Sequence, residues 1–226
     1  PGNPDVRPLL PSRSAPGPMK ATLRGPTGRC SGSHHLRERS RLPQAAREGD
    51  GAPIVRRRRR RPSLHTMGNQ LGQAESAYLR SAAHQPIHWF PWSEEAFAAA
   101  TSDDRPILLD IGAVWCHWCH VMDGESYEDP RLAEFLNQHF VCIKVDRDER
   151  PDVDARYQRA VQAITRQGGW PLTAFLTPSG QVFYGGTYFP PDGKYGRPGF
   201  RSVLEQVLRI YRQERDRVEQ QATTLE

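Results

Sequence analysis

The chain has 226 residues, enough for one domain or a small pair. Its charge is split: residues 1–66 hold 15 Lys and Arg against 4 Asp and Glu, whereas the remaining residues hold 16 against 22. No apolar run approaches the roughly 18 residues of a membrane-spanning helix, and no apolar core of a secretory signal follows Pro1 or Met67. We therefore expect no membrane span and a cytoplasmic folded domain.

The first segment, residues 1–66, differs in composition from the rest. It is rich in Pro, Gly, Ser and Arg, has no hydrophobic periodicity, and carries an unbroken arginine run from Arg56 to Arg61. Such a segment buries too little apolar surface to offset the chain entropy lost on folding. Arginine runs also occur in nucleic-acid patches and transit peptides, but we favour a disordered extension without a function of its own. We expect a folded domain over 67–226 that binds neither nucleic acid nor membrane.

After Met67 the chain alternates between helix-like and strand-like patterns. Ser93 fits an N-cap, with Glu94 and Glu95 in the first turn of an Ala-rich helix. Short apolar runs bounded by turn residues predict buried strands, and apolar residues at helical spacing predict amphipathic helices. In chain order, the patterns predict a helix from Ser93, a strand from Pro106, a helix from Cys116, a helix from Asp129, a strand from Phe140, a helix from Asp152, a strand–turn–strand hairpin from Leu172 and a helix from Phe200. This order predicts an α/β fold with a central mixed sheet flanked by helices.

The stretch WCHWCH, Trp115 to His120, directly follows the predicted strand from Pro106 and allows three interpretations. It matches a haem attachment site, a zinc site of two Cys and two His, or a redox-active Cys-x-x-Cys pair. Haem attachment requires export, for which the sequence has no signal, and four zinc ligands so close in sequence are hard to close into a tetrahedron. Zinc stays the open alternative, and we expect no cofactor and no bound metal.

The redox pair is favoured because Cys116 lies at a strand-to-helix junction. Unsatisfied backbone N–H groups and the helix dipole favour a thiolate there. Cys116 is therefore expected to be the exposed attacking thiol, and Cys119, one turn later, the buried resolving thiol. A protonated His117 would further stabilise the thiolate, whereas His120 is expected on the helix surface. Cys142 fits a small buried hydrophobic residue of the strand from Phe140.

Three separate stretches resemble the thioredoxin fold, in the same order. ILLDIGAVWCHWC resembles the thioredoxin strand with a buried acid, here Asp110, six positions before the first cysteine. IKVD resembles the strand whose lysine, here Lys144, approaches that acid. GGWPLTAFLTPSG resembles the segment in which a cis-proline, here Pro171, lies against the dithiol. The resemblance implies that Asp110 accepts the Cys119 proton and that Lys144 moderates the pKa of Asp110.

The same motifs imply a substrate-binding edge. Pro171 would present a backbone edge on which an extended substrate can pair. Trp115, Trp118 and Trp170 are placed by the motifs around the site, where Trp118 and Trp170 would contact the substrate.

A longer set of motifs, from Asn69 to about Phe200, resembles the N-terminal thioredoxin-like domain of the spermatogenesis-associated protein 20 family. The motifs are AYLRSAAHQPIHWFPWSEEAF, CHWCHVM, ESYEDPRLAEFLN, KVDRDERPDVDARY, GGWPLTAFLTP and GGTYFPP. Members of that family usually continue into a helical toroid resembling sugar epimerases, which this chain lacks, so a carbohydrate-related role is not carried over to it. Where the family more often has Ser, this chain has Asp110, and Val114 and Trp115 replace its usual Ser-Thr; both changes move the site toward ordinary thioredoxin.

These motifs predict a thiol–disulfide oxidoreductase that acts on protein disulfides and receives electrons from an unidentified donor. A second hypothesis is a non-catalytic thioredoxin-fold module that binds a partner through the Pro171 edge and the aromatic rim. Asp110 and Trp115 favour catalysis. The two hypotheses differ in their dependence on sulfur, since catalysis requires Cys116 and Cys119, whereas binding would survive their replacement by serine.

Overall fold

The computed structural model of the chain describes residues 68–193 and 198–224. The predicted extension, residues 1–66, and the predicted domain start at Met67 lie outside these ranges. The helical elements are η2 (Leu71–Gln73), α1 (Ala77–Ser81), α2 (Glu94–Asp103), α3 (His117–Met122), η3 (Asp123–Tyr127), α4 (Pro130–His139), α5 (Pro151–Thr165), α6 (Phe200–Gln213) and α7 (Arg215–Thr224). The strands are β1 (Trp89–Phe90), β2 (Ile107–Gly112), β3 (Val141–Asp146), β4 (Leu172–Leu176) and β5 (Val182–Gly186).

Within the described residues, the strands form one mixed sheet in the order β1-β3-β2-β4-β5. β3 runs parallel to both β1 and β2, whereas β4 is antiparallel to β2 and to β5. The register places Asp110 of β2 opposite Lys144 of β3 and opposite Thr173 of β4. The predicted α/β architecture with a central mixed sheet is therefore confirmed.

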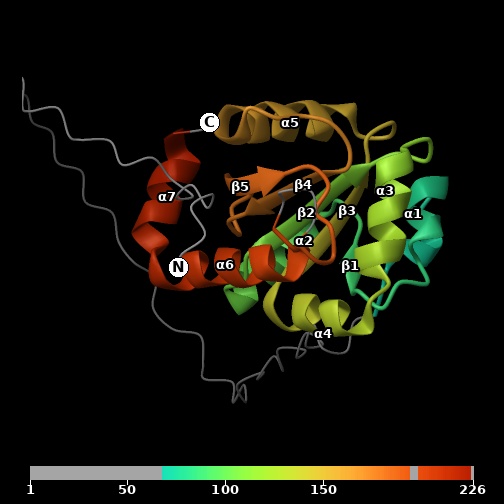
Figure 1. The fold of residues 1–226 in the computed structure, drawn as a ribbon, viewed down its shortest axis with the longest axis horizontal. Helices are drawn as coiled ribbons and strands as arrows, with labels where there is room; N and C mark the ends of the chain where they lie inside the picture. Colours follow the sequence, from blue (N-terminus) through green and yellow to red (C-terminus); the bar gives the residue numbers. More distant parts are fainter. Residues whose placement is uncertain (1–67, 194–197, 225–226) are drawn as a thin grey trace, which may run out of the picture. The chain divides into compact units, whose positions relative to one another are not determined.

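The two faces of the sheet carry separate hydrophobic clusters, because successive side chains of a strand point to opposite sides. Leu108 and Phe175 face α1, α3, α4 and α6. Leu109 and Ala174 face α2 and α5. Figure 1 shows α5 and α6 on opposite sides of the sheet. Every residue of β2 and β3 is buried, which explains why these strands read as continuous apolar runs rather than alternating ones.

The predicted helix starts are confirmed where a side chain caps the helix. Ser93 Oγ accepts a hydrogen bond from the Ala96 N–H at 3.4 Å at the start of α2. Asp129 Oδ1 accepts one from the Arg131 N–H at 2.7 Å at the start of α4, where Pro130 takes the first helical position. Cys116 caps α3. The predicted hairpin is also present as β4 and β5.

Three features differ from the prediction. β1 has two residues, too few for an alternating pattern to be recognised. α1, a helix of five residues, was likewise not predicted. The single helix predicted from Phe200 is divided into α6 and α7 at Glu214, whose φ of −125° and ψ of 43° lie outside the helical region. No helix in the described ranges is both long and apolar enough to cross a membrane.

Candidate active site

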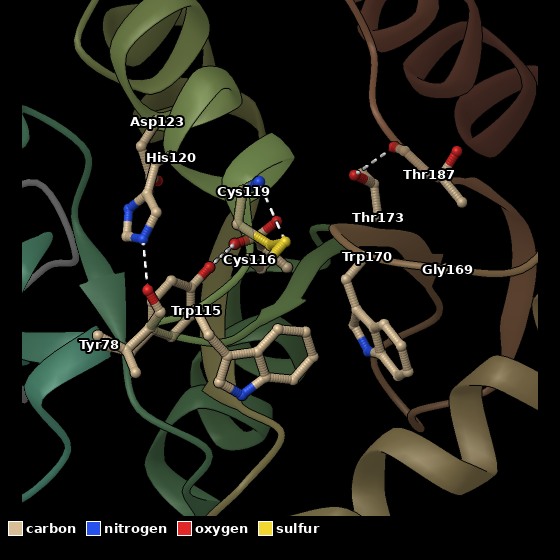
Figure 2. Close-up of a disulfide and its surroundings, with 12 residues drawn as sticks. Tyr78, Trp115, Cys116, Cys119, His120, Asp123, Gly169, Trp170, Thr173 and Thr187 are labelled. Carbon is tan, nitrogen blue, oxygen red and sulfur yellow. Dashed lines mark hydrogen bonds between the residues drawn. A yellow bond between two sulfur atoms is a disulfide. The ribbon is translucent and has the colours of Figure 1, made fainter.

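The predicted cysteine pair is a disulfide in this structure. Cys116 Sγ and Cys119 Sγ are bonded at 2.08 Å (Figure 2). Cys116 caps α3, and its Sγ accepts a hydrogen bond from the Cys119 N–H at 3.2 Å. The expectation of an exposed Cys116 was wrong for this state: 6% of Cys116 is exposed against 1% of Cys119. The neighbouring Trp115 and His117 take the exposed positions.

Asp110 lies in the interior of β2, with 1% of its surface exposed. Lys144 Nζ donates to Asp110 Oδ2 at 2.6 Å, as the register of β2 and β3 allows. Two buried tyrosines also donate to this carboxylate, Tyr78 to Oδ2 at 3.4 Å and Tyr127 to Oδ1 at 3.3 Å. The structure therefore brings together Asp110 and Lys144, and it adds two phenols that the sequence did not indicate.

A second buried carboxylate, Asp123, completes what we call the buried charge cluster, made of Asp110, Asp123 and Lys144. Lys144 Nζ donates to Asp123 Oδ1 at 2.9 Å, and Gln85 Nε2 donates to the same oxygen at 3.0 Å. Asp123 begins η3, a single π-helical turn, a form that occurs frequently at functional sites. The cluster thus holds one cation and two carboxylates.

Protonation in this cluster follows from its burial and its unequal charges. Burial alone lowers the pKa of Lys144, but the charges of Asp110 and Asp123 outweigh it and hold that pKa well above its ordinary value. Burial raises the pKa of Asp110, which Lys144 lowers and Asp123 raises further. One lysine does not balance two carboxylates, so Asp110 binds a proton more readily than an exposed aspartate does.

The cluster meets the disulfide beside Gly112, the last residue of β2. A methyl group on Gly112 would lie 2.2 Å from the Tyr78 hydroxyl oxygen and 2.8 Å from Cys119 Sγ. Both atoms therefore occupy the space that a side chain at position 112 would fill. Figure 2 shows the Tyr78 ring directed from α1 toward the cysteine pair.

Aromatic side chains surround the disulfide, as the motifs implied. Trp115 and Trp118 are 56% and 52% exposed. Trp115 and Trp170 meet edge to face, with ring centroids 5.8 Å apart, and the Arg147 guanidinium lies 4.3 Å from the Trp170 centroid. The Trp118 ring is 5.0 Å from that of Tyr188. The rim consequently has two sides, one formed with Arg147 and one with Tyr188.

The remaining predicted residues lie at the same end of the sheet. His117 is exposed, with its ring 5.7 Å from Trp118. His120 is also on the surface, where its Nε2 lies 2.7 Å from the Val114 carbonyl oxygen. The Trp170–Pro171 peptide bond is cis, and Pro171 directly precedes Leu172, which pairs with Ile111 near the end of β2.

The zinc alternative finds no support in the described ranges, which contain no group of three or more His, Cys, Asp or Glu side chains arranged to hold a metal ion. Cys142, the other cysteine within those ranges, is buried, and burial raises the pKa of its thiol well above the ordinary value.

The strand order, the crossover from β2 through α3 to β3, the terminal hairpin and the position of the Cys-x-x-Cys pair define a thioredoxin fold. This fold with a Cys116–Cys119 disulfide supports a thiol–disulfide oxidoreductase type of function in general.

The family model Thioredox_DsbH, described as "Protein of unknown function, DUF255", matches residues 68–226, and the chain belongs to this family. Spermatogenesis-associated protein 20 of Rattus norvegicus is 44% identical over 155 residues, which are 69% of this chain and 20% of the rat protein. The Homo sapiens protein of the same name is 45% identical over 148 residues, 66% of this chain and 19% of the human protein. The predicted resemblance is confirmed, and the chain spans about a fifth of the length of these relatives.

Solved structures of thioredoxin-like proteins are also similar. A structure titled "DsbH Oxidoreductase" is 19% identical, with a TM-score of 0.41, and the match covers 54% of this chain and 81% of that one. A thioredoxin from Thermus thermophilus is 25% identical, with a TM-score of 0.38, over 57% of this chain and 88% of that one.

The tight space at Gly112 predicts a local clash. Gly112→Ala is expected to lower the free energy of unfolding by about 1 to 3 kcal/mol, because the added methyl group overlaps the Tyr78 hydroxyl and Cys119 Sγ. Gly124→Ala is the matched control, since a methyl group there has no neighbour within 4 Å. Urea unfolding of both variants measures the difference, and equal stabilities would show that position 112 has room to spare.

The raised pKa of Asp110 predicts that the stability of Asp110→Asn, measured relative to the wild type, rises with pH. The folded protein holds the Asp110 proton more tightly than the unfolded chain, so the wild type loses stability as pH rises from the ordinary carboxylate range through the folded pKa. Asparagine does not titrate, so the free energy of unfolding of the variant, measured relative to the wild type, should rise with pH. Urea unfolding from about pH 4 to about pH 8 measures it. Glu134→Gln, on an exposed part of α4, is the control, and a constant Asp110→Asn difference would contradict the prediction.

Proposed function

We propose that the chain is a dithiol–disulfide oxidoreductase that acts on protein disulfides through Cys116 and Cys119. The observation that carries the proposal is the placement of this sulfur pair at the start of α3, next to a buried acid cluster. A structural disulfide needs no proton acceptor, whereas a redox pair moves protons whenever it is made or broken.

In the first step the reduced protein attacks a substrate disulfide. The Cys116 thiolate bonds to one substrate sulfur, the substrate S–S bond breaks, and the other substrate sulfur leaves as a thiolate. The Cys119 N–H that donates to Cys116 Sγ at 3.2 Å supports negative charge on this sulfur. The position of Cys116 at the N-cap of α3 supports its assignment as the attacking residue of the pair.

In the second step Cys119 loses its proton and attacks Cys116 Sγ. The Cys116–Cys119 disulfide forms and the bond between Cys116 and the substrate sulfur breaks. The substrate sulfur leaves as a thiolate and carries the electron pair of that bond. Asp110 is the acceptor for the Cys119 proton, since its raised pKa makes it a better base than an exposed aspartate. Lys144 limits the rise of that pKa through its charge.

Substrate binding is assigned to the surface around the disulfide. Trp118 and Trp170 would contact the substrate, and the backbone next to Pro171 would pair with an extended segment of it. An electron donor that reduces the disulfide completes the cycle in this proposal. The cytoplasmic location expected from the sequence stays a prediction.

A partner-binding module is the second candidate. Val114, Trp115 and Trp118 are each more than half exposed, and large apolar side chains grouped on a surface mark interaction sites. Such a module would use the same aromatic rim and would not depend on sulfur chemistry.

Thiol trapping in the full chain separates the two candidates. After equilibration with reduced and oxidised glutathione, the wild type should interconvert reversibly between dithiol and disulfide. Cys119→Ser should accumulate a mixed disulfide with a protein substrate at Cys116, because the resolving thiol is missing. Cys116→Ser should form none, and Cys142→Ser should behave as wild type because Cys142 is buried and its thiol pKa is raised. Partner retention that is equal in wild type and both site variants, without a mixed disulfide, would favour the binding module.

A further inference from the structure

The Tyr78 hydroxyl lies near Gly112 and Asp110, in the region between the donor and the acceptor of the proposed proton transfer. Its hydroxyl oxygen and Cys119 Sγ both lie within 2.8 Å of the point that a Gly112 methyl group would occupy. The same hydroxyl donates to Asp110 Oδ2 at 3.4 Å. Tyr78 is fully buried, so its hydroxyl is shielded from bulk water. The phenol oxygen and the resolving sulfur therefore approach the same point beside Gly112, and the phenol donates to the proposed acceptor.

We propose that the Tyr78 hydroxyl relays the proton between Cys119 and Asp110, an inference that rests on the proposed oxidoreductase function. When Cys119 resolves a mixed disulfide, its S–H proton passes to the Tyr78 oxygen while the Tyr78 proton passes to Asp110 Oδ2. The Cys119 sulfur then bonds to Cys116 Sγ, and the bond from Cys116 to the substrate sulfur breaks. The substrate leaves as a thiolate, which takes a proton from solvent. Tyr78 ends unchanged, and Asp110 ends protonated.

The fold holds Tyr78 in place from two directions. Ser76, the N-cap of α1, accepts from the Leu79 N–H at 3.0 Å and donates to Asp146 Oδ2 at 2.6 Å. These bonds tie the start of α1 to the end of β3. The Lys144 ammonium lies 4.8 Å from the centroid of the Tyr78 ring.

The groups around the acceptor suit a neutral phenol as relay. Asp110 is faced by Tyr78 of α1, Lys144 of β3, and Asp123 and Tyr127 of η3. Burial raises the pKa of Tyr78 well above its ordinary value, so this residue keeps its proton at rest and donates it to Asp110. Accepting one proton while releasing another avoids a stable phenolate.

Tyr78→Phe and Tyr127→Phe form a matched pair for the test. Each removes one hydroxyl that donates to Asp110, at 3.4 Å and 3.3 Å, and keeps the ring. The Tyr78 hydroxyl and Cys119 Sγ also approach the same point beside Gly112. The Tyr127 hydrogen bond lowers the pKa of Asp110, so Tyr127→Phe acts on the acceptor alone, whereas a loss of the relay would affect Tyr78→Phe.

The measurement is a single turnover of the full, reduced chain with an aromatic disulfide that releases a coloured thiolate at each of its two steps. Tyr78→Phe should leave the first release unchanged and slow the second by roughly tenfold or more near neutral pH, because general acid–base help is lost. This defect should vanish at high pH, where Cys119 ionises without help. Tyr127→Phe removes a hydrogen bond to the acceptor but no relay group, so its slowing should be much smaller than that of Tyr78→Phe over the same range.

Three results would overturn the relay: equal slowing in both variants, slowing by Tyr78→Phe that does not depend on pH, or no slowing.

A proton inventory of the second step in mixtures of light and heavy water tests the wild type without a substitution. Two protons in flight predict a curved dependence on deuterium content, and a straight line contradicts the relay. A wild type that forms no mixed disulfide at Cys116 overturns the proposed function together with the relay, whereas normal turnover with normal resolution in Tyr78→Phe overturns the relay alone.

Discussion

Lys144 is the residue around which the active end of the molecule is organised. A buried ammonium group is costly unless opposite charges and hydrogen bonds surround it. Lys144 obtains them from Asp110 of β2 and Asp123 of η3 at 2.6 and 2.9 Å. The rings of Tyr78, Trp89 and Tyr127 lie 4.8 to 5.2 Å from its nitrogen. Lys144 of β3 therefore contacts side chains of β1, β2, α1 and η3.

The charge imbalance in this cluster connects the fold to the proposed chemistry. Burial raises the proton affinity of Asp110, Lys144 opposes this effect through its charge, and Asp123 adds to it. Asp110 binds this proton close to the disulfide, because Gly112 leaves room for Cys119 and Tyr78. A single glycine at the end of β2 is thus what allows the sulfur pair and the acid cluster to approach each other. In the proposed mechanism the cluster stores the proton that the resolving thiol gives up.

Much of the fold was predictable because it depends on local signals. Ser93 and Asp129 cap helices through contacts within three residues, and the buried strands appear in the sequence as apolar runs. The placement of Asp110 opposite Lys144 came from the resemblance to thioredoxin, since residues 34 positions apart have no local signal. The relay residue Tyr78 is 32 positions from Asp110, and its short helix lacks a periodic pattern.

Other features could not be foreseen for different physical reasons. Asp123 follows α3 in a polar stretch typical of a solvated surface, and only the π-helical turn and Lys144 explain its burial. The burial of Cys116 in the disulfide depends on the packing around the pair, which a strand-to-helix junction in the sequence does not reveal. β1 is defined by pairing with β3 rather than by its own two residues.

Proton exchange between Cys119 and the buried charge cluster is tested most directly by carbon-13 NMR titration of the Asp110 carboxyl group in oxidised and reduced protein. In the oxidised protein, Asp110 should titrate above the ordinary carboxylate range. Reduction should shift its titration, because a Cys119 thiol beside Tyr78 then shares the proton with it. An ordinary Asp110 titration, identical in the two oxidation states, would contradict a cluster that exchanges protons with the redox pair.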